Sequence, residues 1–354
     1  IENIVSCAAD GAPSMIGKQN GFLKMLKDRN PEMLTIHCVI HREHLVAKKL
    51  TPALHDVMMS VIRCINHIKG NSKHERLFKQ FCLDQQEEYV RLLLHTEVRW
   101  LSKGRCLQRF MELYDTLGQF LNDFEEMKSL KTLDGKTYVS YLTDIFELLN
   151  GLNLKLQGKK ITLLDAKEKI LGFVKFLRLA INNLQLKRFD QFAWLKKCKV
   201  SSGALKTILE HLRGLIDDFN KRFSDLIAMN ISLWINQAFA ISLEDVELEF
   251  QQELAEVQSS KTLESTFRTK GVLMWLDDEV GSRYPRCASH AKSVLVHFPS
   301  SYLVECGFSA VNDMVTSKRN RLEITQRGDL RLKLTSIAPE IKKLCAQQTA
   351  QISH

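Results

Sequence analysis

The sequence predicts a fold that is α/β plus all-α, with a short α/β unit, a long helical region and a mostly helical chain overall. Short apolar runs rich in β-branched residues occur near the start, at residues 4–9 and 33–41. From residue 42 onward, apolar residues recur at the three- and four-residue spacing of amphipathic helices. Hydrophobic residues make up 45% of the 354 residues and only 6 are proline, which favours a folded protein over a disordered one.

The first 41 residues predict a strand, a helix and a second strand. The apolar run 4–9 ends at Asp10-Gly11, which breaks a strand. Residues 14–31 predict one helix that Asn30-Pro31 terminates, and residues 33–41 predict the second strand. In that helix, Ser14 is the expected cap and the expected inward-facing residues are Phe22, Leu23 and Leu26. A strand–helix–strand order favours a parallel pair with a right-handed crossover.

Five apolar stripes predict helices in the region that follows. They run over residues 57–68, 110–124, 138–152, 170–184 and 205–223. Residues 152–160 predict a loop, and residues 299–348 predict further helices. We therefore expect residues 42–290 to be almost wholly helical.

Charge and cysteine content limit the possible functions. The formal net charge is +9, from 50 Lys and Arg against 41 Asp and Glu, which permits a polyanionic partner. Nine cysteines without framework spacing indicate reduced thiols of a cytosolic or nuclear protein. The sequence contains no apolar run near 20 residues, so we expect no membrane span. Because the first residue is Ile1 rather than Met, we expect the chain to have lost its natural start.

Asp10 is the first candidate site residue. It follows the first predicted strand, and functional groups gather at the carboxyl edge of open α/β sheets. An Asp-Gly pair is also a common turn, so Asp10 fits either role.

The segment "HCVIHREH" supplies four potential metal ligands or catalytic groups: His37, Cys38, His41 and His44. Cys38 and His41 could both bind zinc, but a structural site needs four ligands and no matching pair follows at finger spacing. A free thiol and a hydrogen-bonded imidazole are the alternative, and we predict that Cys38 and His41 are not zinc ligands.

Two basic segments are candidates for DNA binding. In "EVRW", Arg99 and Trp100 could hold phosphate and stack on an extruded base, or Trp100 could be a half-buried residue at a helix start. Near the end of the chain, Lys318, Arg319 and Arg321 follow a helical stripe that contains Glu305. The position of Glu305 is consistent with two roles, a surface residue or a metal-ligating acid.

These motifs together resemble the hAT superfamily of DNA transposases, and more narrowly its domesticated members that carry a BED-type zinc finger. The resemblance covers nearly the whole chain and rests on "CAADGAPSMIGKQNGF", "HCVIH", "EVRW", "LNLKLQGK" and "YLVECGFSAVNDMVTSKRNRLE" in this order. "HCVIH" resembles the family's Cys-x-x-His motif, which makes Cys38 and His41 a structural motif.

The resemblance implies a ribonuclease-H-like core that a large helical insertion interrupts. Residues 1–41 would be the first, truncated part of the core, residues 42–290 the insertion, and residues 291–354 the C-terminal core helices with a dimerisation signature. It also implies three acids that bind Mg²⁺, of which Asp10 matches the second and Glu305 the third. The first acid and the BED finger would lie upstream of Ile1. By the same resemblance, Trp100 would support a flipped base near the active centre.

The function that this resemblance implies is that of a domesticated transposase-like nuclear protein. It would bind DNA and form a homo-oligomer, but this chain would have no transposition activity because one metal-binding acid is missing. Mg²⁺ would be needed only if activity survives. If the core is ribonuclease-H-like, the Cα atoms of Asp10 and Glu305 should lie within about 15 Å of each other. Alternatives are an active DDE-type DNA transposase or nuclease in the full-length protein, and a protein-interaction scaffold.

Overall fold

The structure is a computed structural model, and it describes residues 3–93, 101–158, 160–315, 328–335 and 340–343. The chain divides into two compact units, Ile1–Ser300 and Ser301–His354, and each is described by itself. Helices dominate the described residues, as expected from the sequence. Among these helices, none is long and apolar enough to cross a membrane.

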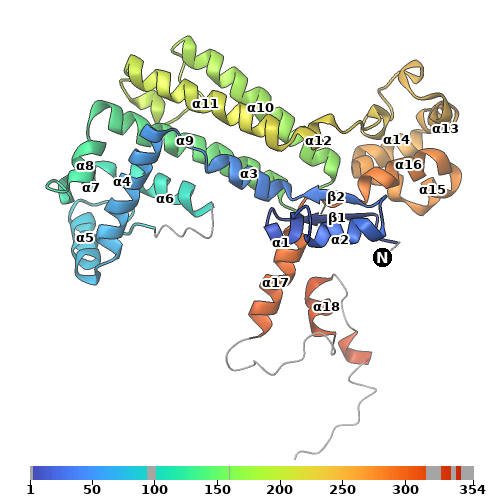
Figure 1. The fold of residues 1–354 in the computed structure, drawn as a ribbon, viewed down its shortest axis with the longest axis horizontal. Coiled ribbons are helices and arrows are strands. Elements are labelled where there is room, and N and C mark those ends of the chain that lie inside the picture. Colours follow the sequence, from blue (N-terminus) through green and yellow to red (C-terminus); the bar gives the residue numbers. More distant parts are fainter. Residues whose placement is uncertain (1–2, 94–100, 159, 316–327, 336–339, 344–354) are drawn as a thin grey trace, which may run out of the picture. The chain divides into compact units, whose positions relative to one another are not determined.

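The first unit begins with a small parallel sheet. Strand β1 (Ser6–Ala9) pairs with β2 (Leu34–His37), with Ser6 opposite Leu34 and Ala9 opposite His37. Helices α1 (Pro13–Ile16) and α2 (Phe22–Arg29) form the connection that a parallel pair requires (Figure 1). The predicted parallel pair is therefore confirmed.

The connecting helix was predicted incorrectly as one element. The chain breaks between α1 and α2, where Gly17 and Gly21 approach so closely that a Cβ on Gly21 would lie 2.4 Å from the Gly17 nitrogen. Ser14 is not a cap, because α1 begins with Pro13 and its N-cap is Ala12. Phe22, now at the start of a new helix, is 47% exposed, whereas Leu23 is buried.

The second strand is shorter than predicted, because α3 (Val39–Ala47) begins within residues 33–41. The Val39 amide donates to the carbonyl of Pro299 (3.0 Å), and the Arg42 amide donates to the carbonyl of Cys38 (3.0 Å). Val39 and Val46 are fully buried on this helix. Tertiary packing thus overrides the strand preference of β-branched residues here.

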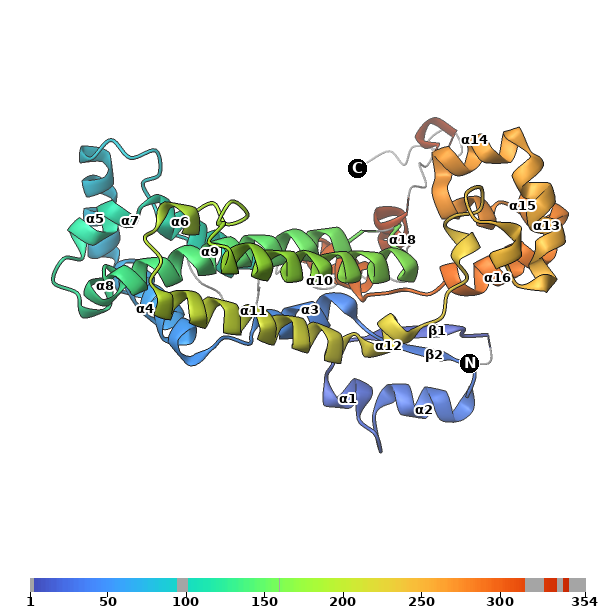
Figure 2. The same ribbon diagram turned by 90° about the horizontal axis from the view of Figure 1, so that it is seen from above.

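Helices fill the rest of the first unit (Figures 1 and 2). The next ones in chain order are α4 (Pro52–Lys69), α5 (Ser72–Asp84), α6 (Leu101–Glu112), α7 (Tyr114–Phe120), α8 (Glu125–Leu130), α9 (Leu133–Leu156), α10 (Leu163–Gln185), η1 (Leu195–Lys197), α11 (Ser202–Arg222) and α12 (Ser224–Ala228). After them come η2 (Leu233–Ile235), η3 (Leu243–Asp245), α13 (Leu248–Ser259), α14 (Lys261–Lys270), η4 (Gly271–Leu276), α15 (Asp278–Arg283) and α16 (Pro285–Leu295). Between residues 42 and 290, the described positions include no strand.

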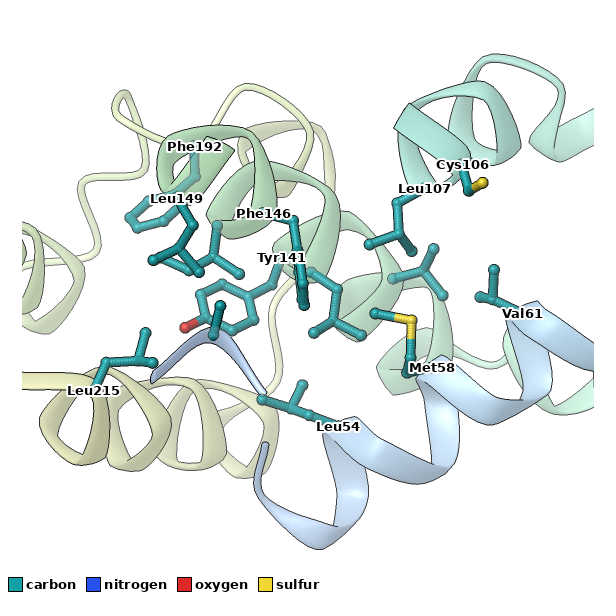
Figure 3. Close-up of a cluster of buried hydrophobic side chains, with 14 of the residues drawn as sticks. Leu54, Met58, Val61, Cys106, Leu107, Tyr141, Phe146, Leu149, Phe192 and Leu215 are labelled. Atoms are coloured by element: carbon teal, nitrogen blue, oxygen red, sulfur yellow. The ribbon is translucent and has the colours of Figure 1, made fainter. Parts of the chain in front are cut away.

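Helix α9 is the centre of the larger hydrophobic core. It contacts α3, α4, α6, α8, α10 and α11. Leu54 and Met58 of α4 and Leu107 of α6 point toward Tyr141 and Phe146 of α9 (Figure 3). Full burial of each such aliphatic or aromatic side chain contributes roughly 1.5–3 kcal/mol relative to exposure.

Four of the five predicted stripes lie on single helices, α4, α9, α10 and α11. The stripe over residues 110–124 is different, since it runs from the end of α6 through α7 and past it. The predicted loop also begins later than expected. Helix α9 continues to Leu156 because Leu152 and Leu156 are still buried in the core.

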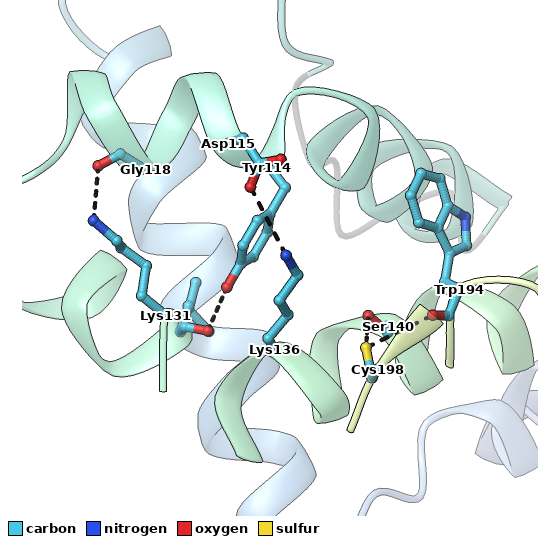
Figure 4. Close-up of polar contacts among 9 residues, drawn as sticks. Tyr114, Asp115, Gly118, Lys131, Lys136, Ser140, Trp194 and Cys198 are labelled. Carbon is cyan, nitrogen blue, oxygen red and sulfur yellow. Dashed lines mark hydrogen bonds and ion pairs between the residues drawn. The ribbon is translucent and has the colours of Figure 1, made fainter. Parts of the chain in front are cut away.

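Polar contacts join neighbouring helices at the edge of this core (Figure 4). The Tyr114 hydroxyl donates to the Leu130 carbonyl (2.6 Å), which ties α7 to the end of α8. Near η1, the Cys198 thiol donates to the Ser140 hydroxyl (3.3 Å). Buried polar groups in such positions are satisfied by protein partners, as folded proteins require.

A second hydrophobic core is formed mainly by residues 231–295. Trp234 and Trp275 are fully buried there, in an edge-to-face arrangement with their ring centroids 5.3 Å apart. Leu164, in the first turn of α10, also belongs to this core. That turn is fixed by a capping box between Thr162 and Asp165.

The second unit contains α17 (Tyr302–Met314) and α18 (Asp329–Leu334). The two helices contact each other, and Lys333 forms an ion pair with Asp313 (3.1 Å). Ala310 is the one buried residue among the described positions of this unit. Helix α17 exposes the apolar residues Leu303, Val304 and Phe308.

Candidate functional site

The carboxyl edge of the β1–β2 sheet brings Asp10 close to the start of α3. Asp10 follows directly after β1 and is exposed. One of its carboxylate oxygens accepts a hydrogen bond from the Ala12 amide (3.2 Å). This bond is the turn contact that an Asp-Gly pair is expected to make.

Gly11 lies against two imidazole rings. A Cβ at this position would be 2.9 Å from Nε2 of His37 and 3.1 Å from Nε2 of His41. The first distance is shorter than van der Waals contact allows, so a side chain would displace the rings. The need for glycine beside Asp10 therefore comes from the histidines of "HCVIHREH".

His37, His41 and His44 form a row of imidazoles along the start of α3. The ring centroids of His37 and His41 are 5.4 Å apart, and those of His41 and His44 are 6.4 Å apart. Burial, followed by the charge of Arg42, lowers the pKa of His37. Burial, with Lys48 as the next cause, lowers the pKa of His44 to about 4. His37 and His44 are therefore neutral at physiological pH.

The described residues of this edge do not fit a Mg²⁺ site. Mg²⁺ prefers oxygen ligands in octahedral geometry, and Asp10 is the carboxylate that this edge offers. Asp225 is near His37 but is engaged by Arg42. Over the described parts of the chain, no three His, Cys, Asp or Glu side chains are grouped so as to hold a metal ion.

Cys38 occupies the junction between β2 and α3. Its side chain is 1% exposed, and its amide donates to the Ala9 carbonyl (2.8 Å), which extends the pairing of β1 and β2 by one residue. His41 lies on the first turn of α3. Both residues thus belong to the strand-to-helix junction, and the absence of zinc there stays a prediction.

Arg42 is a buried cation that the sequence reasoning missed. Its side chain is 3% exposed, and its guanidinium donates to the Arg222 carbonyl (2.9 Å) and to the Asp225 carboxylate. The same group stacks over Phe223, 4.7 Å from the ring centroid. Arg42 therefore anchors α3 to the end of α11 and the start of α12.

Glu43 is the second missed residue, and it is fully buried. Its Oε2 accepts a hydrogen bond from Nδ2 of Asn153 on α9 (2.5 Å). Burial raises the pKa of Glu43 to about 8. One signal for both residues was available in the sequence, because positions 42, 43 and 46 share the buried stripe that begins at Val39.

A hollow of about 390 Å³ lies beside His37. Its apolar wall comes from α1, α2 and β2, through Ile16, Leu23 and Ile36. The other lining residues are Gly17, Lys18, Lys24, Lys27, Thr35, His37 and Asp225. The edge of the sheet that carries Asp10 is therefore next to a surface with an excess of positive charge.

Glu305 lies in the first turn of α17, where the Ser301 hydroxyl donates to its Oε1 (3.0 Å). A carboxylate in this position is favourable for the helix dipole. Asp10 belongs to the first unit and Glu305 to the second. Their shared metal site and the expected Cα separation therefore stay predictions.

Five predicted DNA-binding residues lie outside the described residues. They are Arg99, Trp100, Lys318, Arg319 and Arg321. Their roles remain those that the resemblance implies.

Part of the chain matches a known protein family. Residues 37–185 match the family FAM200-GTF2IRD2-like, described as the FAM200/GTF2IRD2 helical domain. The matched segment begins at His37, the last residue of β2, and continues through α3 to the end of α10. It covers fewer than half of the residues of the chain. In this segment the chain is similar to the FAM200/GTF2IRD2 helical domain, from a family that is related to domesticated hAT transposases.

Proposed function

We propose that this chain is part of a domesticated hAT-transposase-like protein that binds DNA and self-associates, without transposition activity of its own. The observation that carries the proposal is the match of residues 37–185 to a family related to domesticated transposases. The net charge of +9 supports a polyanionic partner. A DNA-binding role also implies a nuclear location, which imaging of the tagged protein would test.

The carboxyl edge of the sheet supports a binding role over catalysis. Two-metal phosphoryl transfer needs several carboxylates around the ions, and Asp10 is the acid described at this edge. His37 and His44 offer nitrogen rather than the oxygen ligands that Mg²⁺ prefers, and the guanidinium of the nearby Arg42 is positively charged. In contrast, the lysines beside His37 suit phosphate oxygens.

Fluorescence anisotropy with a short labelled DNA duplex tests DNA binding. We expect weak, sequence-independent affinity that falls as salt rises. Charge reversal at Lys318, Arg319 and Arg321 should reduce the affinity by severalfold or more. Equal binding by this triple variant would place the DNA contacts elsewhere, and an affinity that salt does not change would favour the scaffold alternative.

The exposed apolar face of α17 supports self-association. Leu303, Val304 and Phe308 are exposed together on one helix, and Phe308 is 66% exposed. Sedimentation should show an oligomer that Phe308→Asp weakens. As a control, Leu248→Asp changes a residue that is 86% exposed in the first unit and should leave the oligomer intact.

A nuclease in the full-length protein is the second candidate, because acids stand at both motif positions, Asp10 and Glu305. If it is correct, Mg²⁺-dependent cleavage by the full-length protein should be lost in Asp10→Asn and in Glu305→Gln, while both variants still bind DNA. Cleavage that survives both substitutions would exclude these acids as metal ligands.

A further inference from the structure

A second hollow with a positive lining lies on α5, and none of the residues that line it is one that the sequence marked for DNA binding. Its volume is about 330 Å³. The lining residues are Ser72, Glu75, Arg76, Lys79 and Arg91. Three of the five are cations and one is an anion.

The one carboxylate in this hollow is already neutralised. Glu75 accepts a charge-assisted hydrogen bond from Lys69 at the end of α4 (2.5 Å), and this bond is the main cause of the lowered pKa of Glu75. Arg76, Lys79 and Arg91 form no ion pair with any carboxylate among the described residues. The hollow therefore carries an excess of about three positive charges.

Some neighbouring cations in this part of the first unit are paired, unlike Arg76, Lys79 and Arg91. Arg63 forms an ion pair with Glu126 (3.6 Å). Arg109 donates to Glu112 (2.9 Å) and stacks on Tyr89, 3.6 Å from the ring centroid. Like charges around one hollow repel each other unless an anion is bound.

The hollow has a fixed frame. Helix α5 is held by Phe78 and Cys82, which are buried in the larger core. After α5 the chain reverses through Gln86, whose φ of 58° is left-handed. The following segment is anchored by buried Leu92 and by the Arg91 carbonyl, which accepts from Arg109 (3.2 Å). Arg91 is thereby brought opposite Arg76 and Lys79 of α5.

Side chains rather than backbone amides would make the contacts. The first free amides of α5, at Lys73 and His74, already donate to the side chain of Asn71. Arg76 and Lys79 are three residues apart, so their Cβ atoms are roughly 5–6 Å apart on one helix face. Arginine binds phosphate oxygens through its planar fork, and lysine binds them as a point charge.

We propose that this α5 hollow binds phosphate groups of a DNA backbone through Arg76, Lys79 and Arg91. The proposal rests on the proposed DNA-binding function and adds a contact site within the helical region. A backbone offers closely spaced phosphates along an extended strand, which suits three cations on two segments better than a single small anion does.

The test is a salt series of DNA binding by the full chain. The variant is Arg76→Gln/Lys79→Gln/Arg91→Gln, and the matched control is Lys175→Gln/Arg178→Gln/Arg213→Gln. The control removes the same charge from exposed positions on α10 and α11, with the same helical spacing between its first two residues. It changes no residue of either hollow.

The expected result follows from counterion release. Each lost phosphate contact should lower the salt slope by about 0.9 and the affinity at 0.15 M salt by about fivefold. Three contacts correspond to a slope change of about 2.7 and a loss on the order of 100-fold. The control should keep most of the slope.

A second variant guards against a folding defect. Ser72→Asp places a negative charge in the hollow, while an acid in the first turn stabilises a helix. It should weaken DNA binding without lowering thermal stability.

The outcomes separate this inference from the proposed function. Equal losses in the hollow variant and in the control, or full affinity in Ser72→Asp, would overturn the α5 site while DNA binding itself stands. If the unmodified chain binds no DNA, both proposals fail. If inorganic phosphate at low concentration displaces DNA only from the protein with an intact hollow, the hollow is a site for a free anion, which contradicts the backbone assignment.

Discussion

Glu43 is the residue for which the structure makes the sharpest stability prediction. Its carboxyl group is fully buried between α3 and α9, where Oε2 accepts from Asn153 and Oε1 has no hydrogen-bond partner among the described residues. Glu43→Gln keeps the shape and the acceptor for Asn153 but cannot ionise. The substitution therefore isolates the free energy of keeping this carboxyl group protonated.

The magnitude follows from the pKa of Glu43, which burial raises from an ordinary value of 4.5 to about 8 in the folded protein. Between these values the folded state holds a proton that the unfolded state releases, so stability falls as pH rises from about 4.5 to 8. One pKa unit corresponds to about 1.36 kcal/mol, which gives a loss on the order of 3 kcal/mol by pH 7. Glu43→Gln should remove this loss, so the variant should be more stable than the natural chain by that amount at pH 7 and equally stable near pH 4.5.

Urea unfolding at several pH values between 4.5 and 8 measures the difference. Glu210→Gln, at an exposed position on α11, serves as the control and should leave the pH profile unchanged. Parallel profiles for the natural chain and Glu43→Gln would show that Glu43 is ionised in the folded protein, which would refute the reasoning from burial.

Three further substitutions test the packing of the candidate site and of the larger core, each by urea unfolding. Gly11→Ala should destabilise by about 1 kcal/mol, because the new Cβ displaces the His37 ring; an unchanged stability together with unchanged histidine NMR shifts would contradict this contact. Arg42→Ala should cost about 2–4 kcal/mol, since it removes a buried cation with three partners, and a loss below 1 kcal/mol would mean that these partners are satisfied without it. Tyr141→Phe should cost about 1–3 kcal/mol, because it removes the donor to Nδ1 of buried His211 (2.7 Å). Burial lowers the pKa of His211 to about 4, so its contribution is present above pH 6.5 and is lost as pH falls toward 4; an NMR titration with a midpoint near 6.5 would exclude this.

The helical region could be predicted from the sequence because its periodicity is a property of single helices. The stripes on α4, α9, α10 and α11 repeat every three or four residues, and burial of one face follows from that spacing. The spacing of apolar residues does not reveal a break between two consecutive helices when their apolar stripes lie in line. For this reason the stripe over residues 110–124 was assigned to one helix, although α6 and α7 are separate.

At the junction of residues 38–43, the helical spacing of positions 39, 42, 43 and 46 indicates a buried stripe, but long-range contacts decide the structure of the junction. Val39 begins a helix with its amide bonded to Pro299, which is far away in the sequence. Arg42 and Glu43 are charged and would ordinarily lie on the surface. Their burial depends on partners at residues 222–225 and 153, which local sequence patterns do not reveal.

The first turn of α10 belongs to both hydrophobic cores of the first unit, and this shared position affects how the protein opens. Leu163 packs in the larger core and Leu164 in the smaller one, so adjacent residues anchor two groups of helices. Amide hydrogen exchange should therefore separate into two classes of protection, one for α9–α11 and one for α13–α16. Slowly exchanging amides in the first turn of α10 would report on both classes, and loss of the Thr162 cap should speed up exchange in each.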